Sequence, residues 1–118
     1  MANNFKQDGE VLTLTAPSGG VVSGQGYMIG ALFVVALTTA AQGASFQGKA
    51  TGVFRLTKNT AGSGKAFTEG EIVFWDNTNK RFDKTGTGLF PVGVAAVAAA
   101  TTAASCDVRL NGVAATAA

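Results

Sequence analysis

Residues 71–84 read EIVFWDNTNKRFDK and carry the clearest structural signal in the chain. The run from Ile72 to Trp75 consists of β-branched and aromatic residues, which favour extended strands. It is followed by Asp76-Asn77-Thr78-Asn79, and such residues are common in tight turns because they tolerate left-handed backbone and bond to their own main chain. A second short run around Phe82 comes after this turn. The segment therefore predicts a β-hairpin.

Short apolar runs separated by turn residues continue in both directions from this hairpin. The 118 residues include 16 glycines, and β-branched residues are frequent, which is typical of short strands joined by tight turns. We expect an all-β fold, a compact antiparallel β-sandwich, a jelly-roll-like structure or a small barrel of about ten short strands. No repeat of about 20–50 residues is visible. The predicted strands are residues 10–15, 27–29, 32–37, 44–47, 52–57, 71–75, 90–97 and 107–110.

Two alanine-rich stretches, residues 38–41 and 95–104, leave strand and helical turn open as alternatives. Alanine is the best helix former, yet neither stretch has the apolar period of an amphipathic helix. We expect residues 1–118 to form a single β domain, because a chain of this length can build one core. Three segments are expected to lie outside that core as an N-terminal segment, an exposed loop and a flexible tail: residues 1–9, 58–70 and 113–118.

The core is expected to come from the aromatic and aliphatic residues of the stronger strands. Phe54 and Leu56 alternate along one strand, and Ile72 and Phe74 alternate along another, so we expect these four side chains to pack together. Cys106 lies in an alternating run and is interpreted as a small buried apolar residue, with a reactive thiol as the alternative.

Composition excludes several kinds of function. Histidine is absent, so neither a Ser-His-Asp triad nor a histidine-containing zinc site can form. One cysteine cannot close an intramolecular disulfide. The net charge of +2 is small for a dedicated nucleic-acid surface. We therefore expect no enzymatic activity, no cofactor and no metal.

Membrane insertion and secretion are not expected either. The longest apolar run near the start, residues 28–37, is about half the length of a membrane helix. The first residues lack the basic and apolar regions of a secretory signal. We expect a protein that is made and folded in a reducing cytoplasm and has no membrane partner.

Two motifs suggest catalytic or nucleotide chemistry, and each has a plainer interpretation. Residues 62–65, GSGK, resemble part of a phosphate-binding loop, but Asn59 stands where the first glycine is needed and Ala66 replaces the hydroxyl residue, which favours a simple turn. Glu69 and Glu71 are spaced for one strand face and could act as an acid–base pair. No other catalytic group accompanies them, so a solvated edge is the preferred interpretation.

A small basic cluster surrounds Phe82. Lys80, Arg81 and Lys84 could form part of a nucleic-acid surface on which Phe82 stacks a base. The preferred interpretation is a charged edge strand that prevents unwanted strand pairing.

Several short signatures follow one another along the chain. They are GEVL at 9–12, TAPSGGV at 15–21, SG at 23–24, IGALF at 29–33, VA at 35–36, GVFRL at 52–56 with Lys58, GEIVFWD at 70–76, PVGVA at 91–95 and VRLNG at 108–112. In this order they resemble the small capsid cement, or decoration, proteins of tailed bacteriophages and prophages, over residues 9–112. Thr57 departs from the pattern, because the family often has proline before the lysine.

The resemblance implies a structural virion protein without catalytic residues. It would bind the outer surface of the icosahedral head and stabilise contacts between major capsid protein subunits. Its expected partners are the major capsid protein and further copies of itself, as a dimer or trimer at a symmetry or quasi-symmetry axis. The alternative is a phage-encoded nucleic-acid-associated protein that uses the basic cluster. Candidate partner-binding residues, chosen from segments expected to be exposed, are Ala2, Asn3, Asn4, Phe5, Lys6, Asn59, Thr60, Lys65, Phe67, Val113 and Thr116.

Overall fold

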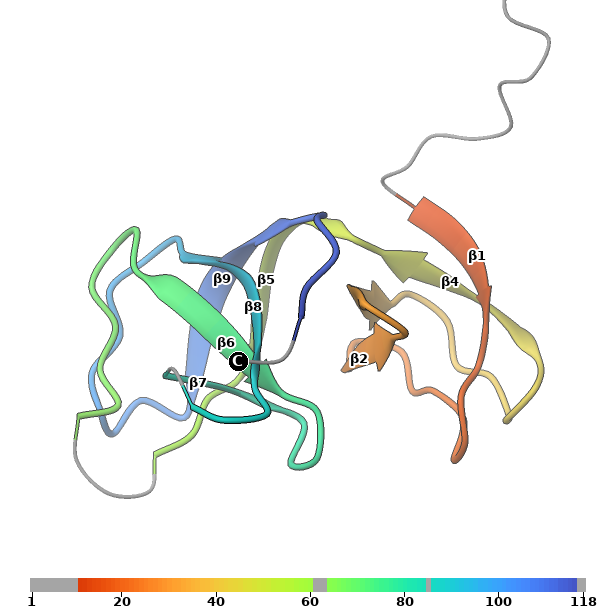
Figure 1. The fold of residues 1–118 in the computed structure, drawn as a ribbon, viewed down its shortest axis with the longest axis horizontal. Coiled ribbons are helices and arrows are strands. Elements are labelled where there is room, and N and C mark those ends of the chain that lie inside the picture. The colour runs from red at the N-terminus through yellow and green to blue at the C-terminus, as the bar shows by residue number, and fades with distance from the viewer. Residues whose placement is uncertain (1–10, 61–63, 85, 117–118) are drawn as a thin grey trace, which may run out of the picture.

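The computed structural model describes residues 11–60, 64–84 and 86–116, and these contain nine strands and no helix (Figure 1). The predicted all-β fold is confirmed, and every predicted strand overlaps an observed one. The strands are β1 (Val11–Thr15), β2 (Gly26–Ile29), β3 (Leu32–Ala36), β4 (Ser45–Lys49), β5 (Thr51–Thr57), β6 (Ile72–Asp76), β7 (Arg81–Asp83), β8 (Phe90–Ala95) and β9 (Ser105–Asn111).

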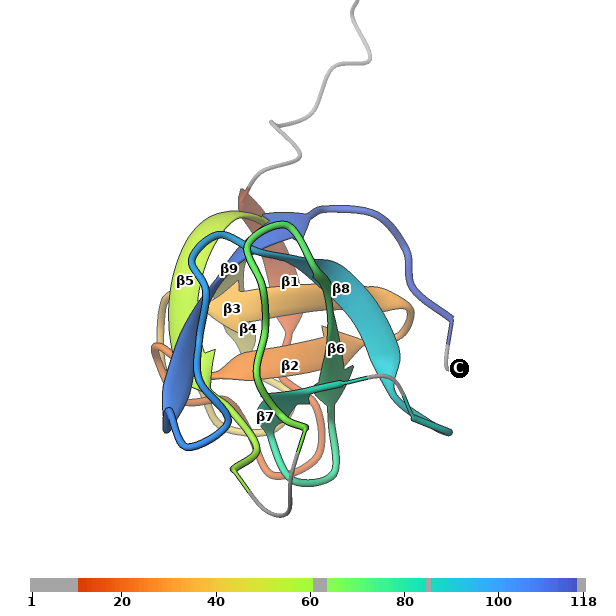
Figure 2. The same ribbon diagram turned by 90° about the vertical axis from the view of Figure 1, so that its left-hand side faces the viewer.

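The strands form two antiparallel sheets, which lie side by side in Figure 1. The first sheet has the order β1-β4-β3-β2 and the second β5-β9-β8-β6-β7. The second sheet curls around a common centre (Figure 2). Its two edge strands meet where Lys58, just after β5, makes a parallel bridge to Phe82 of β7, and the Asn59 amide donates to the Phe82 carbonyl at 2.8 Å. These contacts close the second sheet into a small barrel.

The predicted hairpin at residues 71–84 is confirmed. Trp75 faces Phe82 across the β6–β7 pair. The turn is held by Asp76, whose Oδ1 accepts the amides of Thr78 and Asn79 at 3.0 and 3.1 Å. Lys80 takes a left-handed conformation with φ of 54°. The Asp and Asn side chains thus form the turn for the reason expected from the sequence.

The two sheets repeat the same construction, although no repeat of about 20–50 residues is visible in the sequence. In the first sheet, Leu14 pairs with Phe46 and Thr15 with Ser45. In the second sheet, the same positions pair Leu56 with Cys106 and Thr57 with Ser105. The pair Ala36 and Gly48 in the first sheet corresponds to Ala95 and Val108 in the second. The pair Gly26 and Val35 likewise corresponds to Ile72 and Val94. Strands β1, β2, β3 and β4 therefore correspond to β5, β6, β8 and β9.

The alanine-rich stretches are equivalent parts of this repeat, and neither forms a helix. Each instead supplies one isolated bridge, Ala40 to Val21 in the first half and Ala99 to Phe67 in the second. Short traces of the repeat are present in the sequence, where VLTLT at 11–15 matches VFRLT at 53–57 and Ala44-Ser45 matches Ala104-Ser105. The β7 hairpin is inserted only in the second half, so equivalent residues have no constant spacing.

The halves are joined by an aromatic cluster. Phe33 of β3 packs against Trp75 with ring centroids 4.9 Å apart, and Trp75 packs edge-on against Phe82 at 5.2 Å. Phe33 and Val35 are buried together with the apolar interior of the second sheet. A second cluster, built around Val34 and Phe46, fills the first sheet. One face of β2 and β3 thus covers the second half, while the other face belongs to the first.

The predicted packing of Phe54, Leu56, Ile72 and Phe74 is wrong for Ile72 and Phe74, which belong to neither core cluster. Leu56 is buried and Phe54 is partly buried against the core, but Ile72 is 58% exposed. Val73 and Trp75 fill the interior from β6 in its place. Residues 72–75 are all apolar. Alternation of apolar and polar residues therefore cannot show which face of this strand is buried.

Candidate functional site

The segment 58–70 is only in part the exposed loop predicted from its composition, since Thr60, Gly64, Ala66 and residues 68–70 are exposed but three others are buried. Lys58 is only 2% exposed, and Asn59 and Phe67 are also buried. Thr60 is exposed and Lys65 is half-buried, while residues 61–63 lie outside the described part of the chain. Asn59 and Phe67 were expected to bind a partner because they were expected to be exposed. That expectation of exposure is wrong. Both residues are held by backbone pairing: Asn59 with Phe82 where the barrel of the second sheet closes, and Phe67 with Ala99.

A buried carboxylate connects this segment to β7. Asp83 Oδ2 accepts from Asn59 Nδ2 at 2.8 Å, and Asp83 Oδ1 lies 2.9 Å from Lys65 Nζ. The Lys84 amide also donates to Asp83 Oδ1. Burial pushes the pKa of Asp83 upward, but these donors outweigh it and hold the pKa below its usual value. The ionised carboxylate therefore ties the segment to the barrel.

Lys58, like Asp83, is a buried charged residue that holds neighbouring segments together. Its Nζ donates to the carbonyl oxygens of Asn59 and Thr101 at 3.0 and 2.9 Å. Burial lowers the pKa of Lys58, because desolvation disfavours the charged amine. The equivalent residue of the first half is Ala16, which is also buried. Nothing in the composition of the segment distinguished this lysine from a solvated one.

The basic cluster around Phe82 does not form a base-stacking platform. Phe82 is completely buried in the aromatic cluster. Lys80 Nζ donates to the backbone and side-chain oxygens of Asn77 at 2.7 and 2.8 Å, and Lys84 pairs with Glu71. β7 is the last strand of its sheet, but Phe82 is bridged to Lys58, so the role of these charges in preventing unwanted strand pairing stays a prediction.

Glu69 and Glu71 do not share a strand face. Gly70 lies in a turn with φ of 85°, and Glu71 Oε1 accepts the Thr68 amide at 3.0 Å. The hydrogen bond from Lys84, followed by that from the Thr68 amide, lowers the pKa of Glu71. Glu71 is thus a turn-forming residue paired with a lysine, and Glu69 is exposed beside it.

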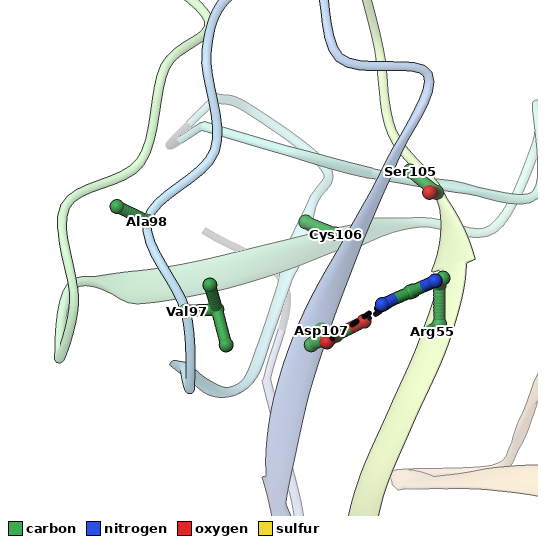
Figure 3. Close-up of a pocket in the computed structure, with 6 residues that line it drawn as sticks. All are labelled: Arg55, Val97, Ala98, Ser105, Cys106 and Asp107. Atoms are coloured by element: carbon green, nitrogen blue, oxygen red, sulfur yellow. Dashed lines mark hydrogen bonds and ion pairs between the residues drawn. The ribbon is translucent and has the colours of Figure 1, made fainter.

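A shallow hollow of about 140 Å³ lies on the outer side of β9, between Arg55, Val97 and Asp107 (Figure 3). Arg55 Nε donates to Asp107 Oδ1 at 2.7 Å across the β5–β9 pair. Cys106 also lines the hollow, but its side chain belongs to the core, and burial raises its pKa to about 11. The interpretation of Cys106 as a buried apolar residue is confirmed.

The described part of the C-terminal segment is anchored at Ala115, whereas the sequence predicts a flexible tail over residues 113–118. The Ala115 amide donates to the Ala31 carbonyl at 2.7 Å, and Ala115 is buried. Val113 and Thr116 remain exposed, as their selection required. Residues 117–118, like the candidate residues Ala2, Asn3, Asn4, Phe5 and Lys6, lie outside the described residues.

The outer face of the second sheet carries a feature that the sequence analysis missed. Register places Ile72 beside Val94, Val94 beside Arg109, and Arg109 beside Val53. We call these four residues the outer row. Ile72 and Val53 are both more than half exposed, and a shallow hollow of about 200 Å³ lies around Ile72, Val94 and Arg109. The matching sequences VLTLT and VFRLT were the signal that could have drawn attention to this face.

No group of acidic residues and cysteine suited to a metal ion occurs within residues 11–60, 64–84 and 86–116. In the same ranges, no helix has the length and apolar character needed to cross a membrane.

These observations define a small all-β protein whose second sheet is closed into a barrel and whose outer row includes exposed apolar residues. The family model described as phage cement protein matches residues 6–110, and the chain belongs to this family. No curated protein and no solved structure matches the chain. The family is structural, and membership makes the protein a component of the phage capsid.

Proposed function

We propose that this protein binds the outer surface of the icosahedral head and stabilises contacts between major capsid protein subunits. The observation that carries the proposal is the family match over residues 6–110. A protein that binds across a subunit boundary only in the assembled shell stabilises that state by linkage. Many copies on one lattice act together, so each contact can be modest.

The fold supports such a role through its closed construction. The two edges of the second sheet are joined at Lys58 and Phe82, and Asp83 fixes the adjoining segment. A rigid body loses little conformational freedom on binding, which leaves more of the contact energy for affinity. We infer that the protein contributes no catalytic step and requires no cofactor in this role.

We propose that the capsid contacts come from the N-terminal segment and from the exposed candidates Thr60, Val113 and Thr116, with the half-buried Lys65 beside them. Asn59 and Phe67 would act by holding the segment 58–70 in place. We also propose that copies of the protein associate with one another on the shell.

Co-sedimentation with expanded, undecorated capsid shells tests the proposal. We expect saturable binding, with a number of copies per shell that identifies the axis occupied. A parallel assay with double-stranded DNA at two salt concentrations is the control, because nucleic-acid binding falls steeply with salt. Absence of shell binding together with salt-sensitive DNA binding would overturn the proposal.

A further inference from the structure

The buried polar side chains of the described residues are Lys58, Asn59 and Asp83, and all three lie where the barrel of the second sheet closes. The first half of the repeat does without them. Ala16 and Pro17 occupy the positions of Lys58 and Asn59 there, and strand β7 with Asp83 has no equivalent. Burial of ionised groups costs free energy through desolvation. The repeated construction therefore does not require this polar group, and its chemistry calls for another explanation.

The carboxylate of Asp83 holds an amine and a primary amide at the same time. Asp83 Oδ1 lies 2.9 Å from Lys65 Nζ, and Asp83 Oδ2 accepts from Asn59 Nδ2 at 2.8 Å. We call Lys65, Asn59 and Asp83 the closure triad. A lysine amine is a nucleophile when it has lost its proton, an amide carbon is an electrophile, and a carboxylate can carry protons between them. Side chains held on one group in this way react without the cost of first meeting.

The second lysine of the segment is committed to other partners. Lys58 Nζ donates to the backbone carbonyl oxygens of Asn59 and Thr101 at 3.0 and 2.9 Å. The amine that pairs with the carboxylate of Asp83 is that of Lys65. Lys65 is therefore the nucleophile that the hydrogen bonds select.

We propose that Lys65 and Asn59 join in an isopeptide bond, with Asp83 as the proton carrier. Asp83 Oδ1 takes a proton from the Lys65 ammonium group, and the free amine attacks Asn59 Cγ. After the attack, Asp83 takes a second proton from the attacking nitrogen. Both protons pass to Asn59 Nδ2, whose bond to Cγ breaks as it leaves as an ammonium ion. The new bond joins Lys65 Nζ to Asn59 Cγ, and the carboxylate of Asp83 is regenerated.

Burial favours this reaction over hydrolysis of the amide. Asn59 is 6% exposed and Asp83 is 8% exposed, so little water reaches the amide carbon. The reaction happens once in each chain, needs no oxidant or cofactor, and is not an enzymatic turnover. It replaces an ion pair by a covalent link beside the exposed Thr60. The bond is independent of the capsid role, which rests on the family match.

Mass spectrometry of the purified full chain tests the bond. After prolonged incubation of the folded chain at neutral pH, we expect a mass about 17 Da below that calculated from the sequence, because one ammonia is lost. Trypsin should no longer cleave after Lys65. The tryptic peptide that carries Asn59 and Lys65 should have the same mass deficit and give no fragments from breaks between these residues. A chain that keeps its full mass overturns the proposal.

Two lysine variants separate this bond from other losses of ammonia. Lys65→Arg keeps a positive charge for Asp83 but has no primary amine, so we expect its full mass. Lys84→Arg is the matched control and should keep the deficit, because Lys84 pairs with Glu71 instead. A deficit that persists in Lys65→Arg would come from a cyclic imide at an asparagine and would overturn the proposal.

The role of Asp83 has its own test. Asp83→Asn retains both reacting residues but removes the proton carrier, so we expect its mass to stay that of the unlinked sequence. A bond that forms in this variant as fast as in the wild type overturns the role of Asp83. In the wild type, a deficit of about 18 Da, the mass of water, would place the bond between Lys65 and Asp83 and overturn the assignment of Asn59.

Discussion

Gly26 shows how a single residue joins the two halves. Its position under the rings of Phe33 and Trp75 leaves no room for a side chain. We expect Gly26→Ala to lower the free energy of unfolding by about 1–3 kcal/mol, because the packed rings must shift. Chemical denaturation measures the change. Gly86→Ala is the control, since its added methyl would meet only the end of the Leu89 side chain; equal losses in both variants would contradict the packing described here.

Asp83 gives the protein a predictable dependence on pH. The pKa of Asp83 is lower in the folded protein than in the unfolded chain, so its stabilising effect is complete above about pH 3.9 and is lost as the pH falls through the folded value. We expect Asp83→Asn to destabilise the protein at pH 7, with a difference from wild type that shrinks in acid. Asp107→Asn, which removes an exposed ion pair with Arg55, is the control and should cost less. A pH-independent loss for Asp83→Asn would contradict the ionised network.

At the scale of elements, the β6–β7 turn links the halves through Asn77. Asn77 Oδ1 accepts from the Met28 amide of β2 and from Trp75 Nε1, each at 3.3 Å. We expect Asn77→Ala to lower the free energy of unfolding by about 1 kcal/mol, because two part-buried donors lose their acceptor. Hydrogen exchange should accelerate at the Met28 amide. The Ala36 amide, bonded to the Gln25 carbonyl at 3.0 Å, should keep its protection; unchanged exchange at Met28 would show that the link is not formed in solution.

The elements themselves could be predicted from the sequence, because turn residues separate short runs of strand-forming residues throughout the chain. The hairpin at Asp76–Asn79 is the clearest case. The buried face of β6 could not be predicted, since Ile72 and Val73 are equally apolar. The burial of Lys58 could not be predicted either, because one carbonyl that accepts from its amine belongs to Thr101, which is far away in the sequence. The repeat was missed because the β7 hairpin interrupts the spacing in one half.

At the scale of the whole molecule, we expect the chain to unfold as a single domain. Phe33 and Val35 come from the first sheet but are buried with the interior of the second, so neither half keeps its core without the other. Fluorescence of Trp75, the only tryptophan, reports on the second half, and far-UV circular dichroism reports on all strands. The two thermal transitions should coincide. Separate transitions would show two independent domains.

The proposed capsid role requires that the bound protein stabilises the shell itself. Scanning calorimetry of expanded, undecorated shells, with and without saturating protein, measures this most directly. We expect the shell transition to move to higher temperature as the protein concentration rises, because ligand binding to the assembled state raises its stability. A shell transition that stays at the same temperature while the protein is fully bound would contradict the claim.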